Sequence, residues 1–85
     1  MSVRVKRVFG NWKMNLARME VMQLISEIND CVAPSGSEIG VFPSFPYIQY
    51  VREMNSTFRV GAQNFYPLEQ GAFTGEVSVL QIKDA

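Results

Sequence analysis

The sequence contains no histidine, so the most common general base and the most common metal ligand are missing from these 85 residues. Its single cysteine, Cys31, cannot form an internal disulfide, which is typical of proteins from a reducing compartment. No apolar run approaches the ~20 residues that a membrane-spanning helix needs, and the basic N-terminus has no apolar segment of a secretory signal. These absences predict a cytoplasmic protein without a membrane partner.

The chain also has no excess of either charge, because eight basic and eight acidic residues cancel. A balanced charge argues against broad electrostatic binding to nucleic acid or to anionic lipid. Arg4, Lys6 and Arg7 form one local basic cluster, which leaves a nucleic-acid-binding protein as a weaker alternative. Because 47% of the residues are hydrophobic, as in ordinary globular proteins, we expect a folded domain rather than a disordered chain.

Segments with strand-like and helix-like patterns alternate along the chain. The expected strands are residues 3–9, 38–44 and 58–65, and the expected helices are residues 16–32, 45–54 and 79–85. Strands that alternate with helices through short connections pair in parallel. A parallel sheet needs cover on both faces, which so few elements cannot supply. We therefore expect an α/β fold in which residues 1–85 form the N-terminal part of one incomplete domain, without a separate second domain.

Local signals predict the ends and faces of these helices. The first helix is expected to have an apolar face that consists of Val21, Leu24, Ile25, Ile28 and Val32, widened by Met19 and Met22. Pro43 should end the second strand, and Ser44 is a good N-cap for the second helix. Ser78 and Gln81 predict a capping box at the start of the third helix.

In parallel α/β folds, ligands bind at the carboxyl ends of the strands. The loops expected at that edge are residues 10–15, 43–46 and 64–78. The first of them, GNWKMN, contains Asn11 and Lys13. A lysine just after a strand suits a phosphate or a developing oxyanion, and the amide can bind the same ligand or hold the lysine in position. The competing interpretation is a solvated lysine beside a turn asparagine.

Other residues at this edge have simpler interpretations. Trp12 is expected to pack, since most large aromatic side chains are structural. Gln63 and Asn64 would satisfy loop backbone groups more often than they would touch a substrate. GAFTGE, residues 71–76, lacks the Gly-Lys-Ser/Thr ending of a phosphate-binding P-loop. We interpret it as a protruding loop with an apolar tip at Phe73, which is typical of a contact surface.

Three stretches of the sequence, taken together, resemble the N-terminal part of the triosephosphate isomerase family. FGNWKMN is similar to the family's first strand and loop, and VFPSFPYI is similar to its second strand and the following turn. VGAQNFYPLEQGAFTGEVSVLQIKDA is similar to its third strand, its long third loop and the start of its third helix. The resemblance covers essentially the whole chain. It implies a (β/α)8 TIM barrel, of which these residues form about the first third.

The resemblance also implies roles for individual residues. Lys13 matches the lysine that stabilises negative charge on the substrate and the enediolate, and Asn11 matches an asparagine that hydrogen-bonds the substrate. The implied reaction interconverts dihydroxyacetone phosphate and D-glyceraldehyde 3-phosphate, in glycolysis and gluconeogenesis, without a cofactor or a metal. Loop 64–78 matches the loop that enters a neighbouring subunit, which implies a homodimer. The residues assigned to that interface are Gln63, Phe73, Thr74, Gly75 and Glu76.

The chain departs from the family in its acid–base groups. The family moves protons with a glutamate base and a neutral histidine, a well-known case of tuned pKa values. This chain has no histidine, and none of its glutamates stands at the matching position. We therefore expect the 85 residues alone to be inactive, although the family is an isomerase. The alternative is a non-catalytic, truncated barrel segment that acts as an assembly or dimerisation partner through loop 64–78.

Overall fold

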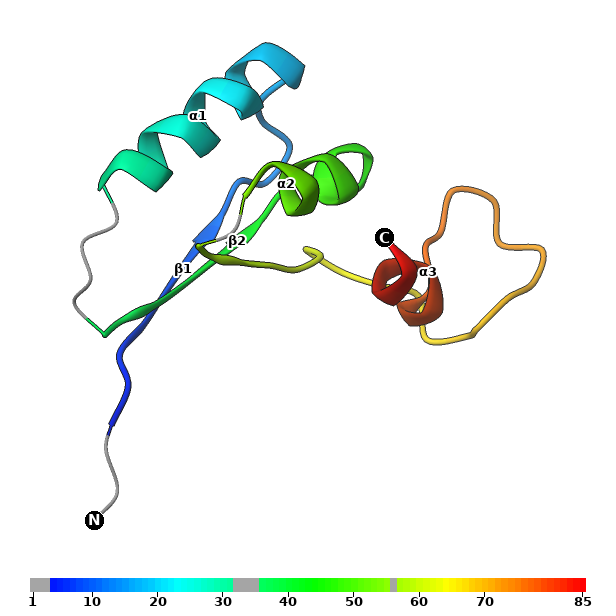
Figure 1. The fold of residues 1–85 in the computed structure, drawn as a ribbon. Coiled ribbons are helices and arrows are strands. Elements are labelled where there is room, and N and C mark those ends of the chain that lie inside the picture. Colours follow the sequence, from blue (N-terminus) through cyan, green and yellow to red (C-terminus); the bar gives the residue numbers. More distant parts are fainter. Residues whose placement is uncertain (1–3, 32–35, 56) are drawn as a thin grey trace.

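The computed structural model describes residues 4–31, 36–55 and 57–85, which form an α/β arrangement (Figure 1). The elements in chain order are β1 (Arg7–Asn11), α1 (Arg18–Cys31), β2 (Glu38–Phe42), the 3-10 helix η1 (Phe45–Tyr47), α2 (Ile48–Met54), β3 (Arg59–Val60) and α3 (Val79–Asp84). The strands form one parallel sheet in the order β1-β2-β3. The predicted alternation of strands and helices and the parallel pairing are thus confirmed.

Strand β1 lies further along the chain than the predicted strand 3–9, whose first residue is outside the described residues. It pairs with β2 from Arg7, opposite Glu38, to Asn11, opposite Phe42. The last two residues of β1 were expected in a loop, and that prediction was wrong. A strand extends as far as a neighbouring backbone can complete its hydrogen bonds, and here β2 begins and ends with β1.

Strand β2 stops at the predicted proline, whereas β3 is shorter than predicted. Strand β2 ends at Phe42 because the next residue, Pro43, has no N–H group to donate to a ladder. Strand β3 covers only Arg59 and Val60, not the predicted residues 58–65. Once β2 has ended, the described residues provide no further strand for β3 to pair with. The apolar pattern thus located β3, whereas its neighbour β2 decided its length.

Helix α1 begins at Arg18, two residues later than predicted. Leu16 has φ 74, which lies in the left-handed region and cannot belong to a right-handed helix. The predicted last residue, Val32, lies outside the described residues. The second predicted helix divides into η1 and α2, with Pro46 in the first turn of η1, where its missing N–H group costs no hydrogen bond.

The predicted capping residues behave differently from each other. Ser78 Oγ accepts a hydrogen bond from Gln81 N at 3.2 Å, and Gln81 Oε1 accepts one from Ser78 N at 2.9 Å. This reciprocal pair confirms the capping box of α3. Ser44 also stands at the N-cap position, before η1, but its side chain makes no capping hydrogen bond. Its hydroxyl donates to a different segment of the chain.

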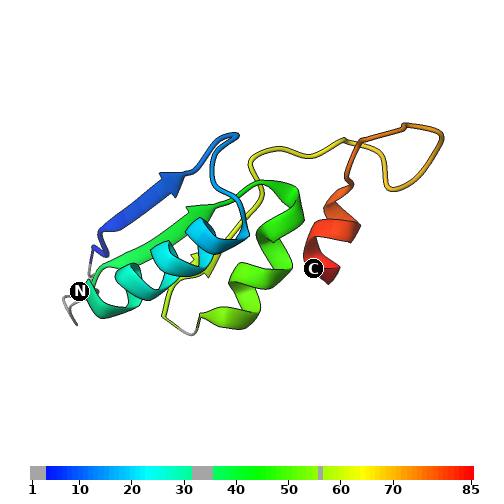
Figure 2. The ribbon, with the colours of Figure 1, turned by 90° about the horizontal axis from the view of Figure 1, so that it is seen from above.

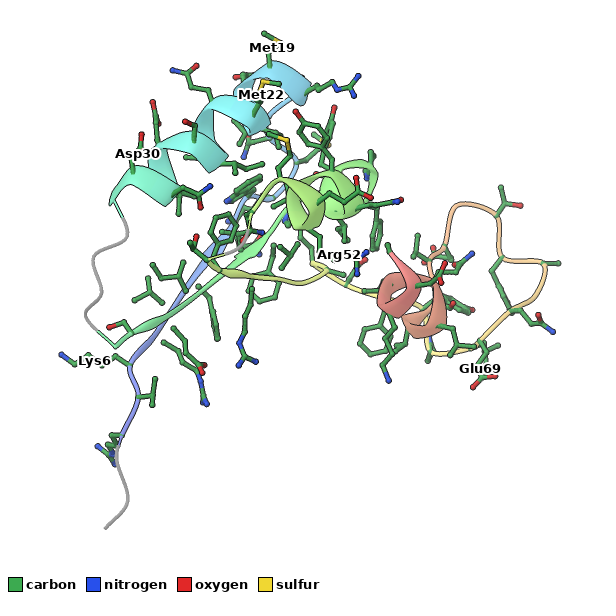
Figure 3. All side chains as sticks on the ribbon, viewed as in Figure 1. Lys6, Met19, Met22, Asp30, Arg52 and Glu69 are labelled. Atoms are coloured by element: carbon green, nitrogen blue, oxygen red, sulfur yellow. The ribbon has the colours of Figure 1, made fainter. Side chains whose placement is uncertain are left out.

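Helices α1 and α2 lie on the same side of the sheet (Figures 1 and 2). The buried core between them and the sheet consists of Val21, Ile25, Val41, Val51 and Phe58, against which Trp12 packs as predicted. Met19 and Met22 do not widen the buried face of α1, because 74% and 40% of their surfaces are exposed. Figure 3 shows Met19 on the side of α1 that faces away from the sheet.

Two phenylalanines lie on the opposite face of the sheet. Side chains alternate along a strand, so Phe42 points away from the helices that cover its neighbour Val41. The Phe9 and Phe42 rings meet edge to face, with centroids 5.7 Å apart. The Phe9 ring lies over Gly40 of β2, and the Phe42 ring lies over Gly61, immediately after β3. Each ring therefore occupies space that a side chain at the facing glycine would need.

Candidate functional site at the carboxyl edge of the sheet

Lys13 has an unusual backbone conformation in the loop that follows β1. Its φ is 53, in the left-handed region that residues with a Cβ atom rarely adopt. Such a conformation costs about 1–2 kcal/mol. It persists only where the surrounding structure fixes it, and residues of this kind are often found at ligand-binding sites.

Three side chains fix the Lys13 backbone. Asn11 Oδ1 accepts a hydrogen bond from Lys13 N at 2.8 Å. Ser44 Oγ donates to Lys13 O at 2.9 Å, and Gln63 Nε2 donates to the same oxygen at 2.8 Å. These residues end β1, follow β2 and follow β3, respectively. The carboxyl ends of all the described strands therefore meet at one peptide segment, as expected for the ligand-binding edge of a parallel sheet.

Gln63 and Asn11 fulfil the structural part of their predicted roles. The bond from Gln63 Nε2 to Lys13 O confirms the expectation that an amide here satisfies loop backbone groups, and the same nitrogen also donates to Phe42 O at 2.8 Å. Asn11 holds the Lys13 backbone, one of the two roles foreseen for it. Sequence reasoning missed the contribution of Ser44, because an N-cap pattern cannot show that the hydroxyl is used elsewhere.

The polar groups that could meet a ligand lie on an open edge. Asn11 and Gln63 line a shallow hollow together with Phe9, Phe42 and Ala62. Lys13 is exposed and does not line this hollow, and it makes no ion pair with any described residue. Asn11 Nδ2 makes no hydrogen bond within the described part of the chain, so it can donate to a ligand. Together these residues offer a cation and an amide donor.

The described residues do not add a metal centre to this edge. Within residues 4–31, 36–55 and 57–85, no group of three or more histidine, cysteine or acidic side chains could hold a metal ion. No helix in the same ranges is both long and apolar enough to cross a membrane. The ammonium of Lys13 and the amide of Asn11 can stabilise an anion electrostatically and donate a hydrogen bond to it.

The loop after β3 projects from the rest of the molecule, as predicted (Figures 1 and 2). Its ends are joined by a hydrogen bond from Tyr66 N to Val77 O at 2.8 Å. Phe73 is only partly exposed, at 38%, because its ring packs against that of Tyr66 with centroids 4.5 Å apart. Phe65 and Leu68 are more exposed, at 59% and 52%. The apolar surface of the loop is therefore broader than the predicted tip.

The remaining residues assigned to the loop form its outer turn. Thr74, Gly75 and Glu76 are all exposed. Gly75 has φ 87, a left-handed conformation that suits glycine, and Glu76 N donates to Phe73 O at 3.0 Å. The interface role of these residues stays a prediction.

An ion-pair cluster occupies the opposite end of the sheet. Glu38 at the start of β2 pairs with Arg7 at 2.8 Å and with Arg59 at 3.4 Å. The hydrogen bond from Arg7 and the charge of Arg59 lower the pKa of the Glu38 carboxyl below its ordinary value. Since Arg7 is occupied by this carboxylate, the basic cluster that suggested nucleic-acid binding is partly neutralised within the chain.

Comparisons with known proteins agree with the resemblance seen in the motifs. The family model described as triosephosphate isomerase matches residues 6–85. A triosephosphate isomerase of Lawsonia intracellularis is 42% identical over 81 residues, which are 91% of this chain and 32% of that protein. Two others, from Legionella pneumophila strains Paris and Lens, are 41% and 43% identical and cover 96% of this chain and 34% of their own. The chain spans about a third of the length of the curated relatives it matches.

Proposed function

The chain belongs to the triosephosphate isomerase family, and from this premise we propose that its residues serve the interconversion of dihydroxyacetone phosphate and D-glyceraldehyde 3-phosphate through an enediolate. The observation that carries the proposal is the fixed Lys13 backbone, to which side chains from the ends of β1, β2 and β3 all bond. A strained residue held by three separate strand ends is expected for a group that must present its charge accurately. A merely solvated loop lysine would need no such support.

Lys13 and Asn11 have distinct roles in this proposal. The Lys13 ammonium stabilises the negative charge that develops on the substrate oxygen as the enediolate forms. Asn11 uses Oδ1 to hold Lys13 N, which leaves Nδ2 to donate a hydrogen bond to the bound triose phosphate. Neither group is suited to remove a carbon-bound proton, because an ammonium has only hydrogens to donate and an amide nitrogen is not basic.

Proton transfer therefore requires groups outside these 85 residues. The family uses a glutamate base and a neutral histidine, and this chain has no histidine. We propose that the chain alone binds substrate weakly and does not turn it over. The reaction then belongs to the whole enzyme, of which these residues supply the electrostatic part of the site.

We also propose that the loop of residues 64–78 mediates a homodimer. Apolar side chains in a projecting loop are costly to leave in water, and Phe65 and Leu68 are both more than half exposed. Met14, directly after Lys13, is 94% exposed and could receive such a loop from a second subunit. The single cysteine is compatible with a cytoplasmic location for this enzyme.

Steady-state kinetics of the complete protein that carries these residues tests the function. Lys13→Ala should lower kcat/KM for glyceraldehyde 3-phosphate by about 10²–10³-fold, the usual effect of removing one group that stabilises an oxyanion. Lys83→Ala, at an exposed lysine of α3, is the matched control and should leave kcat/KM unchanged. If the wild-type protein lacks isomerase activity, the catalytic proposal is wrong and the assembly segment becomes the better explanation.

A further inference from the structure

Ser44 stands where a helix cap is expected but does not act as one. It precedes η1 with an extended backbone, φ −61 and ψ 152, as an N-cap residue should. Its hydroxyl instead donates to Lys13 O at 2.9 Å, a residue 31 positions earlier in the sequence. The 3-10 helix thus forgoes a capping bond from this side chain, and the hydroxyl is used to fix the loop after β1.

We infer that Ser44 is a positioning residue for Lys13, an inference that rests on the proposed isomerase function. A carbonyl oxygen has two lone pairs, and Lys13 O uses them to accept from Ser44 and Gln63. Ser44 is partly buried, whereas Gln63 is exposed. Both bonds lie in exposed surroundings, and the serine donates through a short side chain that loses less rotamer freedom than glutamine when it holds the peptide after Lys13 in place.

The orientation of this peptide controls the direction of the Lys13 side chain. A change of φ from 53 to a negative value would rotate the Cα–Cβ bond and the carbonyl of Lys13 together, so the bonds to Lys13 O oppose it and keep the ammonium near the reacting oxygen. Displacement of a catalytic group by about 1 Å can cost up to 10²-fold in rate. A hydroxyl on a different loop can thus affect catalysis without touching the substrate.

Ser44→Ala and Ser44→Thr in the complete enzyme test this inference, with Ser26→Ala, an exposed serine of α1, as the control. Ser44→Ala should lower kcat/KM about three- to tenfold, the effect of losing one hydrogen bond. Most of the loss should fall on kcat, because the charge on the substrate oxygen is greatest in the transition state. Ser44→Thr keeps the donor and should recover most of the activity, and Ser26→Ala should match wild type.

A second comparison separates positioning from general stability. In a Lys13→Ala background, Ser44→Ala should cause no further loss of kcat/KM, since the group that it positions is gone. An equal loss in both backgrounds, or no loss in the wild-type background, would overturn the inference while leaving the isomerase proposal intact.

The backbone conformation of Lys13 can also be measured directly, without relying on isomerase activity. In NMR spectra, a left-handed residue gives a strong cross-peak between its amide proton and its own α-proton, because the two lie unusually close. This cross-peak of Lys13 should be strong in wild type and weaker in Ser44→Ala. Absence of isomerase activity in the complete wild-type protein would refute the proposed function. An unchanged Lys13 cross-peak in Ser44→Ala would instead refute the positioning role of Ser44.

Discussion

The side-chain amide of Gln63 donates to two carbonyl oxygens at once, those of Lys13 and Phe42, each 2.8 Å from Nε2. A primary amide nitrogen has two hydrogens, so this arrangement uses both of them. One side chain after β3 therefore joins the loop that follows β1 to the end of β2. At the carboxyl ends of the three strands, this amide therefore adds to the backbone hydrogen bonds that hold the sheet together.

Gln63→Glu should destabilise the protein although it barely changes the shape of the side chain. The carboxylate has no hydrogen to donate and places a negative charge beside the two carbonyl oxygens, so the free energy of unfolding should fall by about 1–3 kcal/mol. Urea-induced unfolding measures this change. The matched control is Gln49→Glu, at an exposed position of α2 beside Glu53, where about 0.5 kcal/mol is expected. Equal losses for the two variants would contradict the special role of Gln63.

Gly61→Ala should be destabilising because of the Phe42 ring. A Cβ atom on Gly61 would lie 2.6 Å from Phe42 Cε1, closer than real contacts allow. Forced movement of a packed side chain costs about 1–3 kcal/mol in the free energy of unfolding. In a Phe42→Ala background the same substitution should cost little, since the obstacle is gone. Urea unfolding of the single and double variants measures this coupling. An equal cost of Gly61→Ala in both backgrounds would contradict the role of the Phe42 ring.

Gly10→Ala is the control for that experiment. The nearest atom to a Cβ on Gly10 would be Trp12 Nε1 at 3.8 Å, an ordinary contact. Because alanine also loses less conformational entropy than glycine on folding, stability should stay the same or rise by up to about 1 kcal/mol. A loss at Gly10 as large as that at Gly61 would show that backbone effects, and not the Phe42 ring, explain both results.

The sequence was sufficient to predict the order of the elements but not the lengths of the strands. The apolar patterns located every strand and helix, and the Ser78–Gln81 pair identified the start of α3 correctly. Strand β3 was expected to be longer because its sequence stays apolar, whereas its hydrogen bonds depend on β2, which ends before Pro43. Strand length is a property of two segments, so a pattern in one of them cannot determine it.

The candidate site shows the same division between local and non-local information. Lys13 and Asn11 could be selected because they follow a strand and match a family motif. The left-handed conformation of Lys13 had no local signal, since such a conformation is normally marked by glycine. The Ser44 contact links two loops 31 residues apart, and the capping pattern at Ser44 concealed it. Only the assembled sheet edge brings these groups together.

Ser78→Ala should destabilise the first turn of α3, whereas replacement of an exposed serine within a helix should have little effect. Ser78 is 5% exposed, and its removal leaves the Gln81 amide without its acceptor. Loss of an N-cap costs about 1 kcal/mol, so the Gln81 amide should exchange with solvent several times faster. Hydrogen-exchange NMR measures this rate. Ser26→Ala in α1 should leave exchange in α1 unchanged, and Ser78→Thr should behave nearly as wild type. An unaltered Gln81 rate in Ser78→Ala would show that the capping box contributes nothing.

Glu38→Gln should change how stability depends on pH. Because Arg7 and Arg59 lower the pKa of Glu38 in the folded state, folding favours the ionised carboxylate. The stabilising effect is therefore fully present above the unfolded pKa and is lost as the pH falls through the lower folded pKa. At neutral pH the variant should melt below wild type, and the difference in Tm should shrink as the pH falls below 4.5, the ordinary value for this group.

The prediction for Glu38→Gln can be controlled in two ways, by adding salt and by a second variant. The side chains of Arg7 and Arg59 are 61% and 77% exposed, so added salt should screen the pairs and reduce the difference between wild type and Glu38→Gln. Glu53→Gln on α2, where the carboxylate accepts from Gln49 at 3.1 Å, removes an exposed carboxylate without disturbing this cluster. If both variants show the same dependence of Tm on pH, the arginines do not stabilise the Glu38 carboxylate. If only Glu38→Gln weakens the dependence of Tm on pH at acidic pH, the ion pairs of Glu38 at the amino end of the sheet stabilise the fold. This contribution is independent of the edge that carries Lys13.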